Sequence, residues 1–158
     1  MRWSVLILLF LSLSLFSQRN KCIILSSTMF VSGMLDGTIE TISHHYPYFK
    51  RTFPNANDNY WNPQISWRNK WKGGDPNLGE KFWCSSTLLA WSTDGYHMLR
   101  TSKRMIDFGT IAYYSSYEYT EIKKSKKQRY KTWAIDFLTI SIARSIGFTL
   151  TYNLMFRK

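Results

Sequence analysis

The clearest indication of the architecture is the stretch CIILSSTMFVSGMLDGTIETIS, residues 22–43. It is apolar, and it has the length of about 20 residues that a helix needs to cross a membrane. Gly33 and Gly37 stand one helical turn apart within it, and small residues at this spacing let two helix backbones approach closely in a bilayer. The alternative is the buried core helix of a soluble protein. We therefore expect a long helix packed tightly against a second one.

Three hydrophobic stretches of the chain carry polar or small side chains at helical spacing. The stripes are Ser26, Gly33, Asp36, Gly37, Glu40 and His44 in residues 22–44; Trp83, Ser86, Ala90, Asp94, His97 and Thr101 in residues 83–101; and Asp136, Thr139, Ala143, Arg144, Gly147 and Thr151 in residues 133–155. At about 100° per residue, each stripe covers roughly a third of the helix circumference. Buried ionisable residues in apolar helices are expensive, and they mark a functional centre or a contact between helices.

The composition favours a helical membrane protein over a cytosolic enzyme. The 158 residues suffice for one domain, and their mean hydropathy of −0.29 is that of a soluble protein. This average misleads, because residues 44–82 are strongly polar while apolar residues cluster towards both ends of the chain. Aromatic residues make up 17% of the chain, and Trp and Tyr favour membrane–water interfaces. We predict an all-α fold, a small helical membrane bundle of three to four hydrophobic helices with a Trp-rich extramembrane loop.

The expected organisation is a single membrane domain over residues 1–158. Its segments are an anchor or signal-like helix at 1–17, a helix at 22–44, a polar Trp-rich loop at 45–82, a helical region at 83–118, a basic loop at 119–132 and a C-terminal helix at 133–156. No small-residue cleavage site follows residue 17, so we interpret 1–17 as an uncleaved anchor or half of a helical hairpin, with a cleaved signal as the alternative.

The net charge of +11 indicates an anionic partner. Six of the cations form one block, Lys123, Lys124, Lys126, Lys127, Arg129 and Lys131. The basic blocks adjoin hydrophobic segments, so the expected partners are membrane lipids with anionic headgroups. The sequence has no helix-turn-helix, zinc-finger or RNP-type motif, and no specific nucleic acid is expected. A homo- or hetero-oligomer stays an open alternative.

Arg144 lies in the middle of the last hydrophobic stretch and needs a partner. The nine Leu, Ile and Phe residues of 133–155 favour insertion by about 3 to 5 kcal/mol, whereas a central arginine costs about 2.5 to 3.5 kcal/mol. The helix is therefore marginal alone. Asp136 is too far along the same helix for a one-turn pair, so we expect Asp36 to be the partner of Arg144 across the bundle. We expect Asp36, Asp136 and Arg144 to form a structural polar core.

Two carboxylate–histidine pairs are the candidate catalytic or metal-binding groups. Glu40 and His44 are spaced i, i+4, and Asp94 and His97 are spaced i, i+3, so each pair projects from one side of its own helix. Two such helices facing each other would present two carboxylates and two imidazoles to a divalent metal ion or to a proton-transfer centre. The competing interpretation is that these groups only satisfy one another inside a packed core.

Two runs of the sequence resemble a known family. They are GMLDGTIETISHHY at residues 33–46 and YWNPQISWRNKWKGGDPNLGEKFWCSSTLLAWSTDGYHMLR at residues 60–100. The chain resembles small uncharacterised bacterial and phage-borne integral-membrane proteins, which have a WNP-xxSW-xNKW loop and a helix with Asp-Gly-x-His. The resemblance implies a membrane location, and we expect a multi-pass protein of the bacterial inner membrane. It also implies a site that combines Asp36, Glu40 and His44 with Trp61, Asn62, Trp67, Asn69, Asp94 and His97. The charged stretch 100–107 departs from the family, where a more apolar continuation is expected.

We expect a non-enzymatic integral-membrane protein whose polar core fixes helix packing and whose basic surfaces bind anionic lipid or a protein partner. The alternative is a small membrane-embedded, hydrolase-like enzyme acting on a lipid or envelope substrate. In that enzyme Glu40 or Asp94 would act as the base, and His44 or His97 would transfer protons, because histidine titrates near neutral pH. A secreted basic protein with a cleaved signal ranks last.

Overall fold

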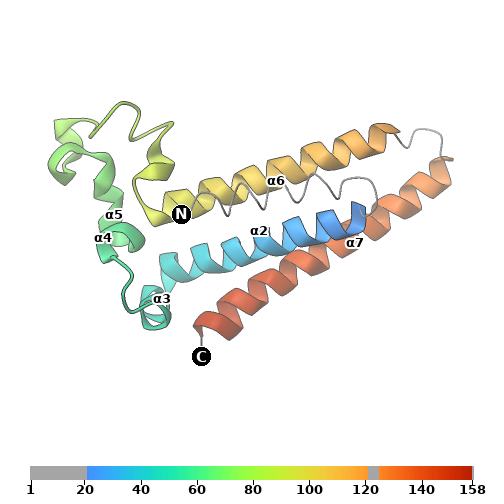
Figure 1. The fold of residues 1–158 in the computed structure, drawn as a ribbon, viewed down its shortest axis with the longest axis horizontal. Coiled ribbons are helices and arrows are strands. Elements are labelled where there is room, and N and C mark those ends of the chain that lie inside the picture. The colour runs from blue at the N-terminus through green and yellow to red at the C-terminus, as the bar shows by residue number, and fades with distance from the viewer. Residues whose placement is uncertain (1–20, 121–124, 158) are drawn as a thin grey trace, which may run out of the picture.

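The computed structural model describes residues 21–120 and 125–157, and the predicted anchor at 1–17 lies outside them. Three long helices lie side by side, with α2 and α7 parallel and α6 antiparallel to both (Figure 1). They are α2 (Lys21–His44), α6 (Gly95–Thr120) and α7 (Lys126–Thr149), and α7 continues as a π-helical segment, η5 (Leu150–Phe156). Every secondary-structure element assigned within the described ranges is a helix, which confirms the all-α prediction.

Residues 45–94 form a cap at the end of the bundle where α2 ends and α6 begins (Figure 1). Its elements are α3 (Tyr46–Thr52), α4 (Asp58–Trp61), α5 (Pro63–Ser66) and the 3₁₀ turns η1 (Trp67–Lys70), η2 (Lys72–Gly74), η3 (Pro76–Leu78) and η4 (Ala90–Ser92). Asn57 and Asn62 begin α4 and α5, because each side-chain oxygen accepts a hydrogen bond from a backbone N–H two residues further on. The segment predicted as a polar loop is therefore built from short helices and turns, of which α4, α5 and η3 are capped by a side chain.

Residues 83–94 do not form the helix that the second polar stripe predicts. The chain makes turns there, and α6 begins only after them. Cys84 has a φ of 55°, which a right-handed helix does not allow. The Glu80 carboxylate accepts hydrogen bonds from the backbone N–H groups of Cys84 at 3.0 Å and of Ser86 at 3.3 Å, which fixes the turn. The first half of the stripe therefore lies off the helix that carries His97.

α7 begins at Lys126, and so takes in much of the basic loop predicted at 119–132. Ser125 and Gln128 form a capping box, in which Ser125 Oγ accepts from the Gln128 backbone and Gln128 Oε1 accepts from the Ser125 backbone. Lys and Arg are good helix formers, so the basic residues that follow Ser125 can continue the helix that this cap begins. Lys126, Lys127, Arg129 and Lys131 stand on the first turns of α7, at the end of the bundle opposite the cap (Figure 1).

α2 and α7 touch through backbone atoms, as the spacing of Gly33 and Gly37 predicts. A Cβ atom on Gly33 would overlap the carbonyl oxygen of Arg144, and one on Gly147 would overlap the carbonyl oxygen of Phe30. Only a residue without a side chain fits where two helix backbones approach this closely. The glycines of both helices therefore set their separation.

The largest cluster of buried hydrophobic side chains lies at the junction of cap and bundle. Ile42, Phe49 and Phe156 are its buried members in the described residues, and Trp61 and Leu99 pack against them. These side chains come from α2, α3 and η5, with α4 and α6 alongside. The core therefore joins the cap to the ends of all three long helices.

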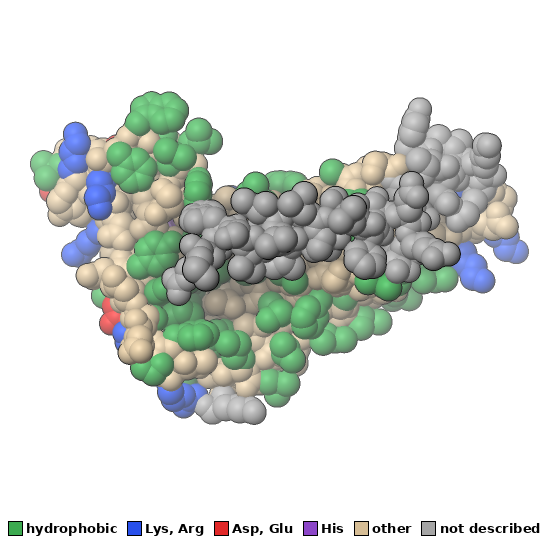
Figure 2. Space-filling model, viewed as in Figure 1, with side chains coloured by type: hydrophobic (Ala, Val, Ile, Leu, Met, Phe, Trp, Pro, Cys, Tyr) green, Lys and Arg blue, Asp and Glu red, His purple; other side chains and the backbone are tan. Residues whose placement is uncertain are grey.

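α2 and the continuous helix Lys126–Phe156 are each long and apolar enough to cross a membrane. Large exposed hydrophobic side chains follow the outer face of α7 and η5: Trp133, Phe137, Leu138, Ile142, Ile146 and Leu154. Figure 2 shows hydrophobic side chains along the bundle and Lys and Arg at its two ends. Two helices of the described part meet the criterion for a span, where the sequence predicts three to four; α6, with its charged residues 100–107, is not one of them.

Candidate functional site

Five polar side chains from all three long helices form one network inside the bundle. This bundle network consists of Ser32 and Asp36 of α2, Lys103 and Asp107 of α6, and Arg144 of α7. Asp36 pairs with Arg144, the partner expected from the sequence, and its other oxygen lies 3.5 Å from Lys103 Nζ. Lys103 Nζ lies 2.7 Å from an Asp107 oxygen, and Ser32 Oγ donates to the second oxygen at 2.5 Å. The network therefore contains two cations and two carboxylates, and its net charge is zero.

The α6 members of the bundle network are not expected from the sequence, where residues 100–107 break an apolar pattern. The signal that identifies them is the i, i+4 spacing of Lys103 and Asp107, which puts opposite charges on one helix face. That face packs against α2, as the contact of Asp107 with Ser32 shows. The charges of α6 therefore join this helix to α2, whose Asp36 also pairs with Arg144 of α7.

Asp136, the remaining predicted member of the polar core, has a different partner. It accepts a hydrogen bond from Lys21 Nζ at 2.6 Å, and the two side chains are only 12% and 10% exposed. The same ammonium group lies 4.5 Å from the centre of the Tyr114 ring on α6. A second polar contact therefore joins the three helices towards the end opposite the cap.

Asp94 and His97 connect the cap to α6 in what we call the cap junction, together with Lys70 and Thr93. Asp94 is 1% exposed, and its Oδ1 accepts from the His97 backbone N–H at 2.9 Å, the usual bond of a helix N-cap. His97 Nδ1 lies 2.9 Å from both Asp94 oxygens, and its Nε2 lies 3.0 Å from Lys70 Nζ. A lysine ammonium group only donates, so Nε2 accepts and Nδ1 carries the proton; the tautomer is assigned from these partners.

The Asp94 carboxylate stays ionised at the cap junction. Burial raises its pKa, but hydrogen bonds from the side chain and backbone of His97, together with the Thr93 hydroxyl, outweigh burial and hold the pKa below its ordinary value. Both ring nitrogens of His97 are thus occupied, one by the carboxylate and one by Lys70. This arrangement fixes the ring and the entry of the cap into α6.

The loop residues that the family resemblance implies shape the cap. The ring of Trp61 lies directly on the first residue of α6, where a Cβ atom would overlap it. Asn62 caps α5, and Trp67 is exposed beneath the Arg68 guanidinium group. Asn69 Nδ2 donates to the carbonyl oxygen of Thr93 at 3.1 Å, so of these four it alone bonds a member of the cap junction.

Glu40 and His44 form a separate, exposed pair. Their side chains are 48% and 64% exposed, and the closest charged atoms are 3.7 Å apart. Within the described residues, no hydrogen bond or ion pair joins this pair to Asp94 and His97. In the same ranges no group of three or more His, Cys, Asp or Glu residues is placed to hold a metal ion. The two pairs are therefore not brought into one ligand set.

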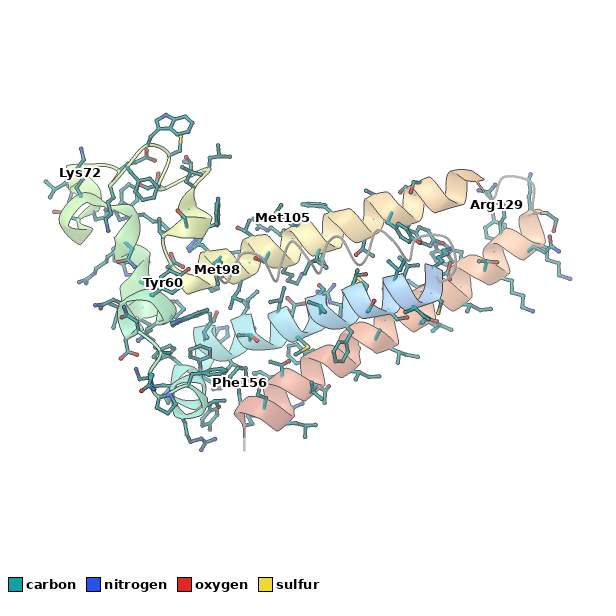
Figure 3. All side chains as sticks on the ribbon, viewed as in Figure 1. Tyr60, Lys72, Met98, Met105, Arg129 and Phe156 are labelled. Carbon is teal, nitrogen blue, oxygen red and sulfur yellow. The ribbon has the colours of Figure 1, made fainter. Side chains whose placement is uncertain are left out.

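A cleft of about 660 Å³, the cap cleft, opens where the cap meets α2, α6 and η5. Its walls include Met34, Thr38, Phe53, Leu99, Met155 and Phe156. Figure 3 shows Phe156 at the end of η5, close to α3. The volume of the cap cleft lies within the roughly 300–1,000 Å³ that is usual for ligand pockets. The sequence gives no sign of this cleft, because its walls come from segments far apart in the chain.

Two cations border the cap cleft. Lys50 Nζ donates to the carbonyl oxygen of Ala56 at 2.6 Å, and Arg51 Nη2 donates to that of Phe156 at 3.2 Å. Ala56 and Phe156 both line the cleft. The cleft therefore combines an apolar interior with a basic edge.

Comparisons of the chain with protein-family models, with curated proteins and with solved structures found no match.

Proposed function

We propose that the protein is a non-enzymatic, multi-pass integral protein of the bacterial inner membrane that binds anionic phospholipids. The observation that carries the proposal is the distribution of exposed side chains, hydrophobic along the bundle and basic at its two ends (Figure 2). Soluble monomers rarely expose so extended an apolar surface. In a bilayer that surface faces the lipid tails, and the cations at each end meet the headgroups.

The bundle network supports a membrane location. Charged residues within membrane helices face the interior of the bundle and pair with one another. Asp36, Lys103, Asp107 and Arg144 all have partners of opposite charge on neighbouring helices or one turn away. The pairing offsets the cost of about 2.5 to 3.5 kcal/mol that a lone central arginine brings to insertion.

The basic ends supply the attraction to anionic lipid. The block on the first turns of α7 comprises the exposed residues Lys126, Lys127, Arg129 and Lys131. Lys72 of the cap and Arg129 of α7 lie at opposite ends of the molecule (Figure 3). A basic residue near an anionic membrane surface contributes about 1 kcal/mol. A few residues of this kind at each end suffice for a marked preference over neutral lipid.

The cap junction favours a structural role over the hydrolase-like alternative. A catalytic histidine needs one ring nitrogen directed at the substrate. In His97 both nitrogens are already hydrogen-bonded, to Asp94 and to Lys70. Glu40 and His44, which would share the proposed active site, are exposed and bonded only to each other among the described contacts.

Membrane insertion is tested by carbonate extraction of cells that express the full chain. We expect the protein to remain in the membrane pellet, because α2 and α7 are held by lipid tails and not by headgroup charge alone. A peripheral membrane protein serves as the control for extraction. Release of the chain into the soluble fraction would contradict the proposal.

Lipid preference is tested by thermal unfolding of the detergent-purified protein with added phosphatidylglycerol or phosphatidylcholine. Binding to the folded state raises the Tm, so we expect the larger rise with the anionic lipid. The difference should shrink as the salt concentration rises, because salt screens exposed charges. Equal shifts with the two lipids at low salt would remove the lipid-binding part of the proposal.

A further inference from the structure

Residues 82–91 of the cap, which we call the aromatic turn, expose several large hydrophobic side chains. Phe82, Trp83, Leu88 and Trp91 are all exposed to solvent. Trp83, at 76%, is the most exposed large hydrophobic side chain in the described part of the chain. A large exposed apolar patch marks a place where a protein meets another molecule or a membrane. The aromatic turn is therefore a candidate interaction surface.

The backbone of the aromatic turn forms hydrogen bonds within the turn and to the rest of the cap. The Leu89 N–H donates to the carbonyl oxygen of Cys84 at 2.8 Å, and the Ser85 N–H donates to that of Phe82 at 3.0 Å. Ser85 is buried, and its Oγ donates to the carbonyl oxygen of Lys70 at 2.7 Å. Backbone groups that are paired within the protein can enter a water-poor environment at low cost. The turn is therefore a fixed platform that leaves its large side chains exposed.

The cap has an apolar side and a basic side. It extends sideways past α6, across the long axis of the bundle (Figure 1). In the part that extends past α6, hydrophobic side chains gather towards the bundle, whereas Lys and Arg side chains lie on the outer side (Figure 2). Lys72 is on that outer side (Figure 3), and its carbonyl oxygen accepts from the N–H of the exposed Asp75 at 3.1 Å. In a bilayer crossed by the bundle, the apolar side of the cap therefore faces the lipid surface.

We propose that the aromatic turn inserts into the interface of the leaflet at the cap end, with Trp83 and Leu88 reaching the upper part of the acyl chains. An indole ring favours this depth, because its apolar body and its polar N–H are both accommodated there. The charged side chains of the outer side then face the aqueous edge of the headgroup layer, as in a protein that lies with one face on a membrane. The inference rests on the proposed function, which puts the cap end of the bundle at a membrane surface.

Insertion is measured with a small fluorescent dye on single cysteines of the full-length protein, in the background Cys22→Ser and Cys84→Ser. The variants are Leu88→Cys on the turn, Asp75→Cys on the outer side and Ile142→Cys on the exposed face of α7. The protein is reconstituted in nanodiscs of phosphatidylcholine and phosphatidylglycerol, in which some lipids carry a nitroxide quencher either near the headgroup or near the end of an acyl chain. We expect the shallow nitroxide to quench the dye at the Leu88 site and the deep nitroxide to quench the dye at the Ile142 site. A water-soluble quencher should act mainly at the Asp75 site.

A second pair of variants tests the contribution of the tryptophan. Trp83→Ser, added to Leu88→Cys, should lower the shallow quenching at the Leu88 site by about half, because Trp83 supplies much of the exposed apolar area of the turn. Tyr130→Ser is the matched control, since Tyr130 is nearly as exposed, at 74%, but stands on α7 at the opposite end of the bundle. It should leave the quenching unchanged. Circular dichroism verifies that the helices persist, and equal effects of the two variants would overturn the inference.

The outcomes separate this surface from the proposed function. If the deep nitroxide quenches the Ile142 site and neither nitroxide quenches the Leu88 site, the bundle crosses the membrane and the inference alone is refuted. Protection of the Leu88 site from the water-soluble quencher as well would mean that a second protein covers the turn. Equal shallow quenching at the Leu88 and Asp75 sites would refute the sidedness of the cap. If lipid quenches nothing at the Ile142 site, the proposed function itself fails.

Discussion

The bundle network and the cap junction are both built from charged side chains, yet they differ in how those side chains are brought together. In the bundle network, two cations and two carboxylates face one another from three helices, and its long-range members come together only when those helices pack. In the cap junction, the Asp94–His97 bonds lie within one helical turn, and Lys70 completes the arrangement from the cap. The first depends on tertiary packing, whereas the second is mostly a local cap.

This difference predicts which part of the molecule each set of charges stabilises. Removing one member of the bundle network leaves an uncompensated charge among apolar helices, which is the expensive case. Removing a member of the cap junction loosens the start of α6 and the cap while the glycine contact between α2 and α7 remains. The two regions should therefore respond to mutation with effects of different size.

The largest effect is expected from Asp36→Ala. Arg144 and Lys103 would lose their shared carboxylate, and the free energy of unfolding should fall by about 2 to 3 kcal/mol. This is less than for a fully buried pair, because the Arg144 and Asp36 side chains are 41% and 29% exposed. Denaturant titration of the protein in detergent measures the loss. The double variant Asp36→Leu with Arg144→Leu leaves Lys103 paired with Asp107 and should recover most of the loss. A double variant as unstable as the single one would show that Asp36 acts by some means other than its charge.

Gly33→Val should destabilise the contact of α2 and α7 by about 1 to 3 kcal/mol, because the new Cβ atom overlaps the carbonyl oxygen of Arg144. Gly109 of α6 is the matched control, since a Cβ atom there meets nothing within 4 Å. Gly109→Ala should be neutral or stabilising by up to about 1 kcal/mol. Thermal unfolding of the two variants compares them, and equal losses would contradict close backbone packing.

Asp94→Ala is expected to cost about 1 to 3 kcal/mol, the loss of an N-cap together with buried hydrogen bonds. Asp75 provides a control of the same residue type, because it is exposed and caps only the short η3 turn. Asp75→Ala should change the stability by no more than about 0.5 kcal/mol. The rate at which a protease cleaves the cap is compared between the two variants, and we expect faster cleavage of Asp94→Ala. Similar rates would show that the cap junction contributes little to stability.

The smallest effect on stability is expected from the protonation of Asp94 at low pH. The pKa of Asp94 is lowered in the folded protein from an ordinary value of 3.8, so below about pH 4 the unfolded state binds more protons than the folded state. The stabilisation from this group is present above that pH and is lost as the pH falls through the folded pKa. Asp94→Asn should remove this part of the pH dependence of the Tm between pH 6 and pH 3. Parallel curves for the variant and the wild type would argue against it.

The long helices α2 and α7 are the part of the fold that sequence patterns predict best. Apolar length identifies both, and the Gly33 and Gly37 spacing identifies the face by which they meet. The unpaired Arg144 leads to Asp36, because a central charge in an apolar helix requires a partner from elsewhere. These predictions succeed because an apolar stretch or a charge within it needs a packing partner. Both features can be recognised within a single segment of the sequence.

The cap and its cleft are beyond such patterns. Residues 83–94 have helical spacing, but the backbone conformation of Cys84 and the contacts of Glu80 override it. The i, i+4 pair of Lys103 and Asp107 looks like an interruption until α2 is placed beside it. The cap cleft has walls from four separate segments, so no local signal exists to find.

The most direct test of the account is the sidedness of the two ends of the bundle. Single cysteines replace the exposed residues Asn55 in the cap and Lys127 on α7, in a background of Cys22→Ser and Cys84→Ser. A membrane-impermeant maleimide is applied to spheroplasts before and after permeabilisation. We expect one position to be labelled in intact spheroplasts and the other only after permeabilisation. Labelling of both positions under the same condition would contradict a bundle that crosses the membrane.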